Sequence, residues 1–156
     1  MQKAQLPLRK CVGIVILNKD NKVFVGKRID QLFDSWQMPQ GGVNLNEPLI
    51  VAMKRELEEE TSIKKIEILK EFDQWLEYEL PENLIGKIWK GKYRGQKQKW
   101  FIIKFTGQEK EINIKTKYPE FSEWKWVDMT LLPHLIVKFK KHIYKDVLLE
   151  LKKYIN

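Results

Sequence analysis

Three glutamates, Glu56, Glu59 and Glu60, have the type and spacing to bind a metal ion. Positions i, i+3 and i+4 of an α-helix share one face, so a helix here would gather the three carboxylates into one patch. The patch would lie near the helix C-terminus, where the helix dipole also disfavours negative charge. Hard divalent cations such as Mg²⁺ take oxygen ligands, commonly a few carboxylates with phosphate oxygens and water. The spacing therefore indicates a metal site for phosphate chemistry.

A run of glutamates is more often a solvated helix face, and the triplet at residues 58–60 alone favours that interpretation. The neighbouring residues favour the metal site. Arg55 precedes the first glutamate, apolar residues recur every four positions from Leu49 to Leu57, and two glycines come before the segment. Glu58 would lie roughly 160° around the helix from Glu56, so we expect it to face solvent.

Gly41, Glu47 and the run from Arg55 to Glu60 resemble the Nudix box, a signature that fixes several residue types at fixed offsets. The family's glycine near the end of this signature is Ser62 here. That position follows the helix, where a left-handed backbone conformation is common. Serine adopts this conformation at a cost of about 1 kcal/mol.

The resemblance extends over residues 9–144. Segments 12–16, 35–42, 95–101 and 119–121 are similar to the bacterial RNA pyrophosphohydrolases, which belong to the wider group of dinucleoside polyphosphate hydrolases. The Gly-Gln-Lys-Gln-Lys-Trp run at 95–100 is the most specific part. The resemblance implies the Nudix α/β/α sandwich, an α/β (α+β) fold with a mixed sheet between helices. It also implies a metal-dependent hydrolase acting on phosphoanhydride bonds.

The Nudix resemblance assigns the catalytic and metal-binding residues. Glu56, Glu59 and Glu60 are the implied ligands of Mg²⁺, with Mn²⁺ or another divalent cation as alternatives. Glu120, from the Pro-Glu-Phe match at 119–121, is implied as a fourth ligand or the general base, and the choice of base between Glu56 and Glu120 stays open. Arg55 would brace the carboxylates through charge-assisted hydrogen bonds. We expect Glu47 to fix the junction between loop and helix rather than to contact substrate.

The same resemblance implies a surface for phosphates and RNA, made of Arg9, Lys27, Arg28, Ser35, Gln40 and Lys140. Lys27 stands where the bacterial enzymes often carry arginine, so the charge is kept and the bidentate fork is lost. Val137 and Phe139 are implied to pack against a base. Periodicity alone would instead place Phe139 in the core, on the apolar stripe of the last helix.

Length and composition point to one domain spanning residues 1–156. No apolar stretch reaches the ~20 residues that cross a bilayer, and the N-terminus does not resemble a secretory signal. Cys11 is the only cysteine, which suits a reducing cytoplasm, and we expect it to be a buried, inert thiol. The net charge of +8 suits a polyanionic partner such as RNA as well as it suits solubility alone.

Patterns along the chain predict its elements. We expect strands at 11–17, 22–28, 66–69, 75–78, 99–105 and 124–127, and helices at 47–61 and 135–154. Residues 29–45 are predicted to be a long loop, and residues 80–98 a basic loop. Trp89 lies among lysines in the basic loop, where it would either contact RNA or be solvated. The spacing of His134 and His142 does not favour a zinc site.

Three functions remain open at this stage. The first is hydrolysis of 5′-triphosphate or 5′-diphosphate RNA to 5′-monophosphate RNA, which would promote mRNA decay. The second is hydrolysis of dinucleoside polyphosphates by the same site. The third is a non-catalytic RNA-binding module, which the presence of all three box glutamates argues against. We expect a cytoplasmic monomer without a membrane partner.

Overall fold

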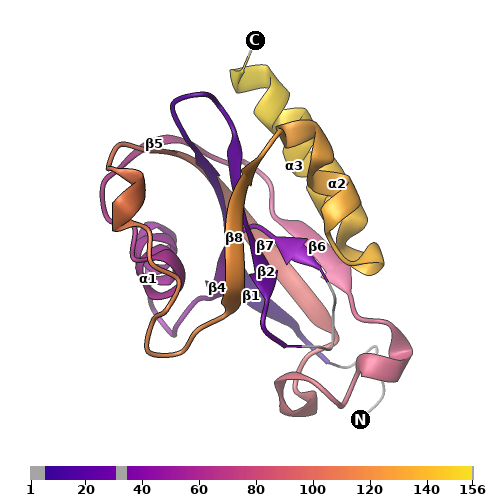
Figure 1. Cartoon of the computed structure of the whole chain (residues 1–156). Helices are drawn as coiled ribbons and strands as arrows, with labels where there is room; N and C mark the ends of the chain where they lie inside the picture. The colour runs from indigo at the N-terminus through magenta and orange to yellow at the C-terminus, as the bar shows by residue number, and fades with distance from the viewer. Residues whose placement is uncertain (1–5, 31–34, 156) are drawn as a thin grey trace.

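The computed structural model describes residues 6–30 and 35–155, in which a mixed sheet lies between helices (Figure 1). Helix α1 covers one face of the sheet, and α2 and α3 cover the other. The predicted α/β/α sandwich is therefore confirmed. The strands are β1 Leu8–Leu17, β2 Val23–Arg28, β3 Trp36–Gln37, β4 Gln40–Gly42, β5 Ile66–Glu71, β6 Leu76–Glu79, β7 Gly95–Phe105 and β8 Phe121–Val127, and the helices are α1 Leu49–Thr61, α2 Leu132–Leu135 and α3 Lys141–Tyr154.

Strand β1 is central because both of its faces are apolar. Val15 and Leu17 pack into the core under α2 and α3, whereas Ile14 and Ile16 pack into the core under α1. Strand β7 runs parallel to β1 along its whole length, from Leu8↔Gly95 to Leu17↔Lys104. In β2, the predicted alternation is also observed, since Val23 and Val25 face one core and Phe24 the other.

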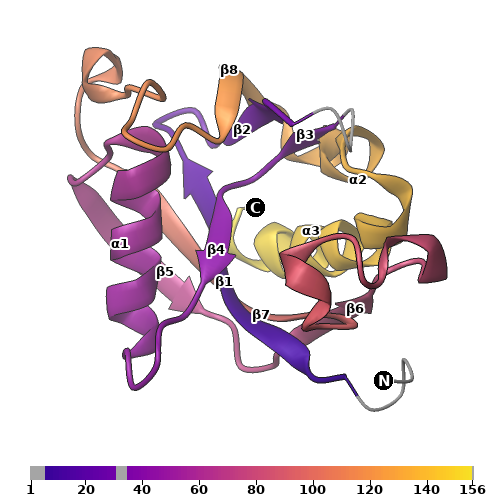
Figure 2. The same cartoon turned by 90° about the horizontal axis from the view of Figure 1, so that it is seen from below.

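The other edge of β1 is shared by two strands. It pairs with β2 at its C-terminal end and with β4 along Cys11, Val12 and Gly13. Figure 2 shows β4 beside β1, with the starts of β1 and β7 next to each other. The expectation of a loop throughout residues 29–45 is thus wrong, because Gln40–Gly42 pairs with the otherwise free edge of β1 as strand β4. This pairing places Gly41 and Gly42 next to α1.

Helix α1 buries Ala52, Met53 and Leu57, which follow the apolar stripe predicted from spacing. It ends at Ser62, which has φ 66° and ψ 8°, in the left-handed region. The Ser62 N–H donates to the Glu58 carbonyl, and its hydroxyl donates to the Asn113 carbonyl at 2.8 Å. Ser62 therefore adopts the backbone conformation expected of the family's glycine.

Two expectations about the second half of the chain need correction. Residues 95–98 belong to β7 rather than to the basic loop, because Gln96 and Gln98 alternate with Lys97 and Lys99 as a strand requires and are buried. The predicted helix at 135–154 is broken. Ile136 and Val137 are extended, with ψ near 154° and 143°, and a 3₁₀ turn at Lys138–Lys140 precedes α3.

The break in the predicted helix has a packing reason. The extended backbone lets Ile136 enter the core, and it turns Phe139 toward Tyr78, with ring centroids 5.7 Å apart. Only Ile143, Val147 and Leu151 of the apolar stripe line the buried side of α3. Within the described residues, none of the helices has the length and apolar character needed to cross a membrane.

The left-handed conformation of Ser62 predicts the relative stability of two variants. Ser62→Gly and Ser62→Ala both lose the hydroxyl bond to Asn113, but only alanine keeps the steric strain of a left-handed residue with a Cβ atom. We expect the glycine variant to be more stable by about 1 kcal/mol. Urea denaturation of both variants measures this difference, and equal midpoints would contradict it.

Candidate active site

The three box glutamates of α1 differ in exposure because they lie at different angles from its buried stripe. Taking ~100° per residue, Glu60 lies roughly 20° from Met53 in the middle of the stripe, Glu56 roughly 60° and Glu59 roughly 120°. The residue is 5% exposed for Glu60, and the side chain is 13% exposed for Glu56 and 59% for Glu59. The patch therefore runs from the core to solvent. Glu58 is exposed on the far side and pairs with Lys64, as expected for a solvent-facing residue.

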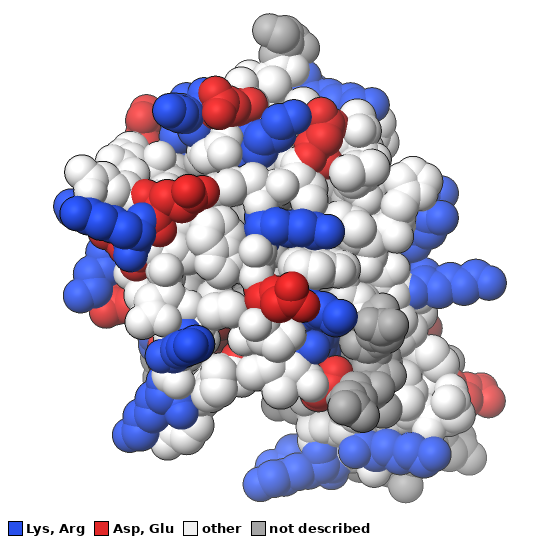
Figure 3. Space-filling view, viewed as in Figure 1, with Lys and Arg blue, Asp and Glu red and all other residues white. Residues whose placement is uncertain are grey.

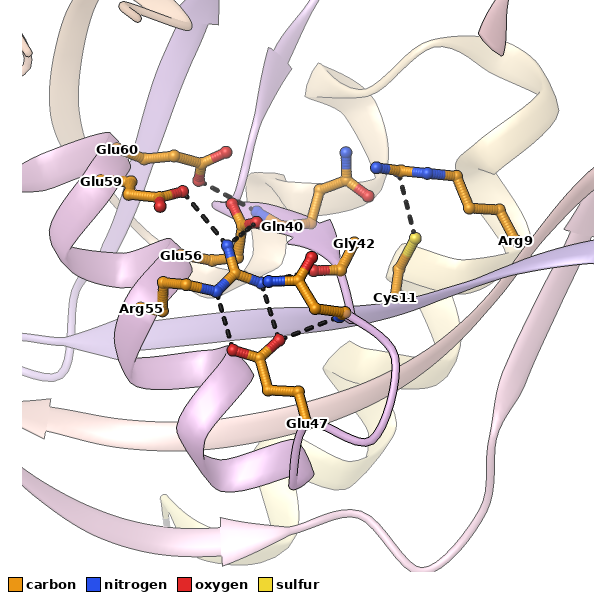
Figure 4. Close-up of polar contacts among 10 residues, drawn as sticks. Arg9, Cys11, Gln40, Gly42, Glu47, Arg55, Glu56, Glu59 and Glu60 are labelled. Atoms are coloured by element: carbon orange, nitrogen blue, oxygen red, sulfur yellow. Dashed lines mark hydrogen bonds and ion pairs between the residues drawn. The ribbon is translucent and has the colours of Figure 1, made fainter. Parts of the chain in front are cut away.

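Arg55 holds these carboxylates and the preceding loop together (Figure 4). Its Nη1 donates to Glu56 Oε1 at 2.7 Å and to Glu59 Oε2 at 3.2 Å. Its Nε and Nη2 donate to the two oxygens of Glu47 at 2.8 and 2.9 Å, and Nη2 also donates to the Gly42 carbonyl at 2.8 Å. The predicted bracing role of Arg55 agrees with this geometry.

Glu47 completes the junction between loop and helix. Besides binding Arg55, its Oε1 accepts the Asn44 N–H at 2.9 Å (Figure 4). The hydrogen bonds from Arg55 and then from Asn44 hold the pKa of Glu47 at about 2. Glu47 is thus an anchor of the loop, as expected, and it is not among the residues lining the cavity described below.

Gly41 and Gly42 leave room for charged groups at this junction. A Cβ atom on Gly41 would overlap the carboxylate of Glu56, and one on Gly42 would overlap the guanidinium of Arg9. Neither glycine has positive φ in the described structure, so space rather than backbone freedom requires them. The two adjacent glycines of β4 thus leave room for an anionic side chain beside Gly41 and for a cationic side chain beside Gly42.

Glu60 is the buried member of the patch. Its Oε2 accepts the Gln40 N–H at 3.2 Å. Burial first, and the nearby charges of Glu56 and Glu120 next, raise the pKa of Glu60 well above its usual value. Burial also raises the pKa of Glu56, although Arg55 opposes the shift. The site therefore holds several carboxylates close together in a buried environment, where their mutual repulsion is strong.

Within the Gln-Lys-Gln-Lys-Trp part of β7, Gln98 holds the Gln40 side chain through a hydrogen bond. Gln98 Nε2 donates to the side-chain oxygens of Gln40 and Gln96, both at 2.9 Å. Its Oε1 accepts from the Trp100 indole at 3.1 Å. Every polar atom of the Gln98 amide group is thus engaged by named partners, which fixes its orientation.

A cavity of about 450 Å³ opens beside these residues. It joins carboxylates, cationic side chains and aromatic rings drawn from several elements. Its lining includes Glu56, Glu59, Glu60, Glu120, Arg9, Arg28, Lys140, Tyr78, Trp89, Phe139, Gln37, Gln40 and Gln96. Nine of the sequence-predicted residues are therefore brought together, namely Arg9, Arg28, Gln40, Glu56, Glu59, Glu60, Glu120, Phe139 and Lys140.

The cationic part of the cavity includes a buried lysine. Lys140 has its ammonium 5.2 Å from the Tyr78 ring centroid, and burial lowers its pKa to about 7. Cys11 lies on β1 nearby, with its Sγ 3.3 Å from Arg9 Nη1, and burial raises its pKa to about 11. The Cys11 thiol is therefore buried and protonated, as predicted.

Besides Arg55, three predicted substrate-binding residues lie outside the lining. Lys27 is in β2 opposite Trp36, one residue before Arg28, and Val137 packs against the core beneath α2 and α3. Ser35 is buried, its carbonyl accepts the Arg28 N–H at 3.3 Å, and its hydroxyl has no partner among the described residues. Their roles toward substrate stay predictions.

Two aromatic lining residues are not among those that the resemblance assigns. Tyr78 is an ordinary strand residue in the sequence, where no pattern indicates its role. The sequence offers two interpretations of Trp89, RNA contact or exposure to solvent. The structure turns it into the cavity, where the Arg9 guanidinium lies 5.8 Å from its ring. Trp89 and Lys90 both have positive φ, at 51° and 57°, a strain that is often found at functional sites.

The carboxylates do not form a closed ligand set in this arrangement. Among residues 6–30 and 35–155, no group of three or more His, Cys, Asp or Glu side chains is placed to hold a metal ion. The ion pairs from Arg55 keep Glu56 and Glu59 directed toward the guanidinium. The donor chemistry nevertheless suits a hard divalent cation, because the carboxylates of four glutamates and Asp30 line one cavity.

Comparison with known proteins identifies the family. The NUDIX domain matches residues 7–147. The chain belongs to the Nudix family. A protein of Pelagibacter ubique (strain HTCC1062) named RNA pyrophosphohydrolase is 62% identical over 154 residues, covering 99% of this chain and 98% of its own length. The resemblance noted in the sequence is confirmed by this match.

Solved Nudix structures share the fold at low identity. The E. coli dihydroneopterin triphosphate pyrophosphohydrolase has a TM-score of 0.71 at 20% identity, over 92% of this chain and 99% of that one. A C. elegans Ap4A hydrolase in a binary complex has a TM-score of 0.66 at 22% identity, over 94% and 95%. These two proteins are named for different substrates, so the fold alone does not select one.

The two glycines of β4 predict separable kinetic effects. Gly41→Ala should displace the Glu56 carboxylate and lower kcat about 10²-fold, as for loss of one charge-stabilising group. Gly42→Ala should displace the Arg9 guanidinium and mainly raise KM. Both neighbours are flexible side-chain ends, so folding should be retained. Steady-state kinetics with circular dichroism tests this, and identical kinetic defects in the two variants would contradict it.

Proposed function

We propose that this protein hydrolyses a phosphoanhydride bond at the 5′ end of RNA, converting a 5′-triphosphate or 5′-diphosphate to a 5′-monophosphate. One observation carries the proposal: a single cavity joins five carboxylates, four of them glutamates, with three cationic side chains and three aromatic rings. These are the groups needed for a metal, a polyphosphate and a base. The 62% identity to a protein named RNA pyrophosphohydrolase supports RNA as the substrate.

The residues fit a divalent cation, and we propose Mg²⁺, with Mn²⁺ or another divalent ion able to replace it. Glu56, Glu59, Glu60 and Glu120 supply only hard carboxylate oxygens. Burial and then repulsion raise the pKa of Glu60, and a nearby cation would oppose both effects. When bound, such an ion neutralises phosphate charge and acidifies a water ligand.

Glu59 can leave Arg55 at little cost. The pair joins positions i and i+4 on an exposed part of the helix, and such pairs are worth about 0.3–0.5 kcal/mol. Arg55 would still hold Glu47 and the Gly42 carbonyl after Glu59 had turned away. The loop and helix therefore stay in place while the ligand set forms.

The cationic side chains would bind the phosphates. Arg9 and Arg28 line the cavity together with Lys140, whose pKa near 7 would rise when a phosphate anion approached. The predicted roles of Lys27 and Ser35 on this surface are part of the proposal. Phe139 and Trp89 supply ring faces for a base, and stacking of this kind contributes ~1–3 kcal/mol per base. Val137 would support Phe139 from the core side.

Two residues remain candidates for the general base. Glu56 and Glu120 both line the cavity. Glu56 has a pKa raised by burial, which favours proton acceptance nearer neutral pH, but Arg55 occupies one of its oxygens. Glu120 is exposed and free to approach a water.

The product, a 5′-monophosphate, would expose a message to 5′-end-dependent ribonucleases. We also propose that the enzyme acts in the cytoplasm and is a monomer.

Hydrolysis of dinucleoside polyphosphates is the second candidate, because they present the same nucleoside-linked polyphosphate to the cavity. Rates with 5′-triphosphate RNA and with diadenosine tetraphosphate, each with Mg²⁺, separate the two. We expect kcat/KM for RNA to be higher by about tenfold or more, equivalent to ~1.4 kcal/mol. Efficient hydrolysis of the dinucleotide with none of RNA would overturn the first choice.

The helix geometry predicts which glutamates matter. Glu59→Gln and Glu60→Gln should each lower kcat by about 10²–10³-fold, because each removes a charge from the proposed ligand set. Glu58→Gln is the matched control on the same helix. It should keep wild-type activity and lose only an exposed pair with Lys64, worth at most about 1 kcal/mol. Equal activity of all three variants would refute the metal assignment.

A further inference from the structure

Lysines gather around one tryptophan outside the catalytic cavity. The Nζ atoms of Lys10, Lys97 and Lys99 lie 5.6, 5.4 and 5.8 Å from the centroid of the Trp75 ring. These four residues are called the Trp75 surface. Over the face in Figure 3, by contrast, Lys and Arg are interleaved with Asp and Glu. A local cluster is therefore more informative than the net charge of +8.

Strand register places the Trp75 surface on the opposite face of the sheet from the cavity. Lys10 pairs with Lys97 across the parallel strands β1 and β7, and Arg9 pairs with Gln96. Arg9 and Gln96 line the catalytic cavity, and neighbouring residues of a strand point to opposite faces. The starts of β1 and β7 lie side by side at this end of the sheet (Figure 2).

Two of the three lysines have no acidic partner among the residues that the structure describes. Lys99 is paired with Glu71 at 3.8 Å and donates to the Asp73 carbonyl at 3.2 Å, and its side chain is 11% exposed. Within the described part of the chain, Lys10 and Lys97 make no ion pair. Three like charges around a half-buried ring repel one another, and an anion would relieve that repulsion.

Lys10 of the Trp75 surface lies beside residues of the catalytic cavity. A second cavity of about 460 Å³ is lined by Lys10 together with Arg9, Gly42 and Glu56. The last three also line the catalytic cavity. Because the second cavity includes both Arg9 and Lys10, it reaches around the sheet from one face to the other.

We propose that the Trp75 surface binds nucleotides of single-stranded RNA that follow the 5′ end held in the catalytic cavity. Lys10 and Lys97 bind the phosphates, and as they leave the ring a base stacks on Trp75. The proposal rests on the proposed function, since it extends the substrate beyond the reacting end. It predicts that RNA length matters, because a short nucleotide cannot occupy both the cavity and this surface.

Direct binding tests the surface without turnover. Without metal, the affinity of a 20-nucleotide single-stranded RNA with a 5′-monophosphate is measured by fluorescence anisotropy over a range of salt. Lys10→Gln with Lys97→Gln should raise Kd about tenfold and reduce the salt slope by ~1.4, at ~0.7 per lysine–phosphate contact. The control pair Lys145→Gln and Lys152→Gln removes the same charge from the exposed side of α3 and should change neither.

Kinetics separate this proposal from the proposed function. With 5′-triphosphate RNAs of about 3 and about 20 nucleotides, wild type should show a lower KM for the longer RNA. Trp75→Ala should abolish that difference while kcat and the values for the short RNA stay unchanged, and Trp75→Phe should retain it. An unchanged Kd and length dependence in the lysine and tryptophan variants would overturn the surface, whereas wild type that hydrolyses neither RNA would overturn the function.

Discussion

The Arg55 guanidinium is the contact on which the rest of the site depends. It binds Glu47 and the Gly42 carbonyl on the loop side, and Glu56 and Glu59 on the helix side. One planar cation thus fixes α1 to the strand that pairs with β1. Without it, repulsion among carboxylates on one helix face would favour fraying of the last turns. The glycines next to it let these charged groups approach the backbone closely.

Arg55 compensates the outer carboxylates but not the inner one. Glu60 is buried, and among residues 6–30 and 35–155 its carboxylate accepts a hydrogen bond from the Gln40 N–H alone; burial first, and then Glu56 and Glu120, raise its pKa. Burying a charge without a cation is costly, so this position is stable only as a protonated acid or beside a bound cation. Because Glu60 is the least exposed of the three glutamates on α1, its ionised form depends most on a bound cation.

The regular parts of the molecule could be predicted from the sequence, because periodicity reflects burial. The stripe from Leu49 to Leu57 and the alternation in β2 both follow from side-chain spacing. The left-handed Ser62 could be predicted because helix ends have few backbone solutions. The short strand β4 could not, since its reason is the free edge of β1, a long-range partner. The break before α3 could not be predicted either, because Phe139 fits the four-residue spacing of a continuous helix. Its contact with Tyr78, which places it outside the buried stripe of α3, is visible only in the structure.

The parts that could not be predicted border the same cavity. Three of its four predicted glutamates come from the regular helix α1, where residue type and spacing suffice, and Glu120 lies just before β8. Lys140 and Trp89 come instead from irregular backbone, a 3₁₀ turn and a left-handed turn. Under the proposed function, α1 supplies carboxylates for a metal ion, and the irregular segments supply Lys140 and two ring faces for the substrate.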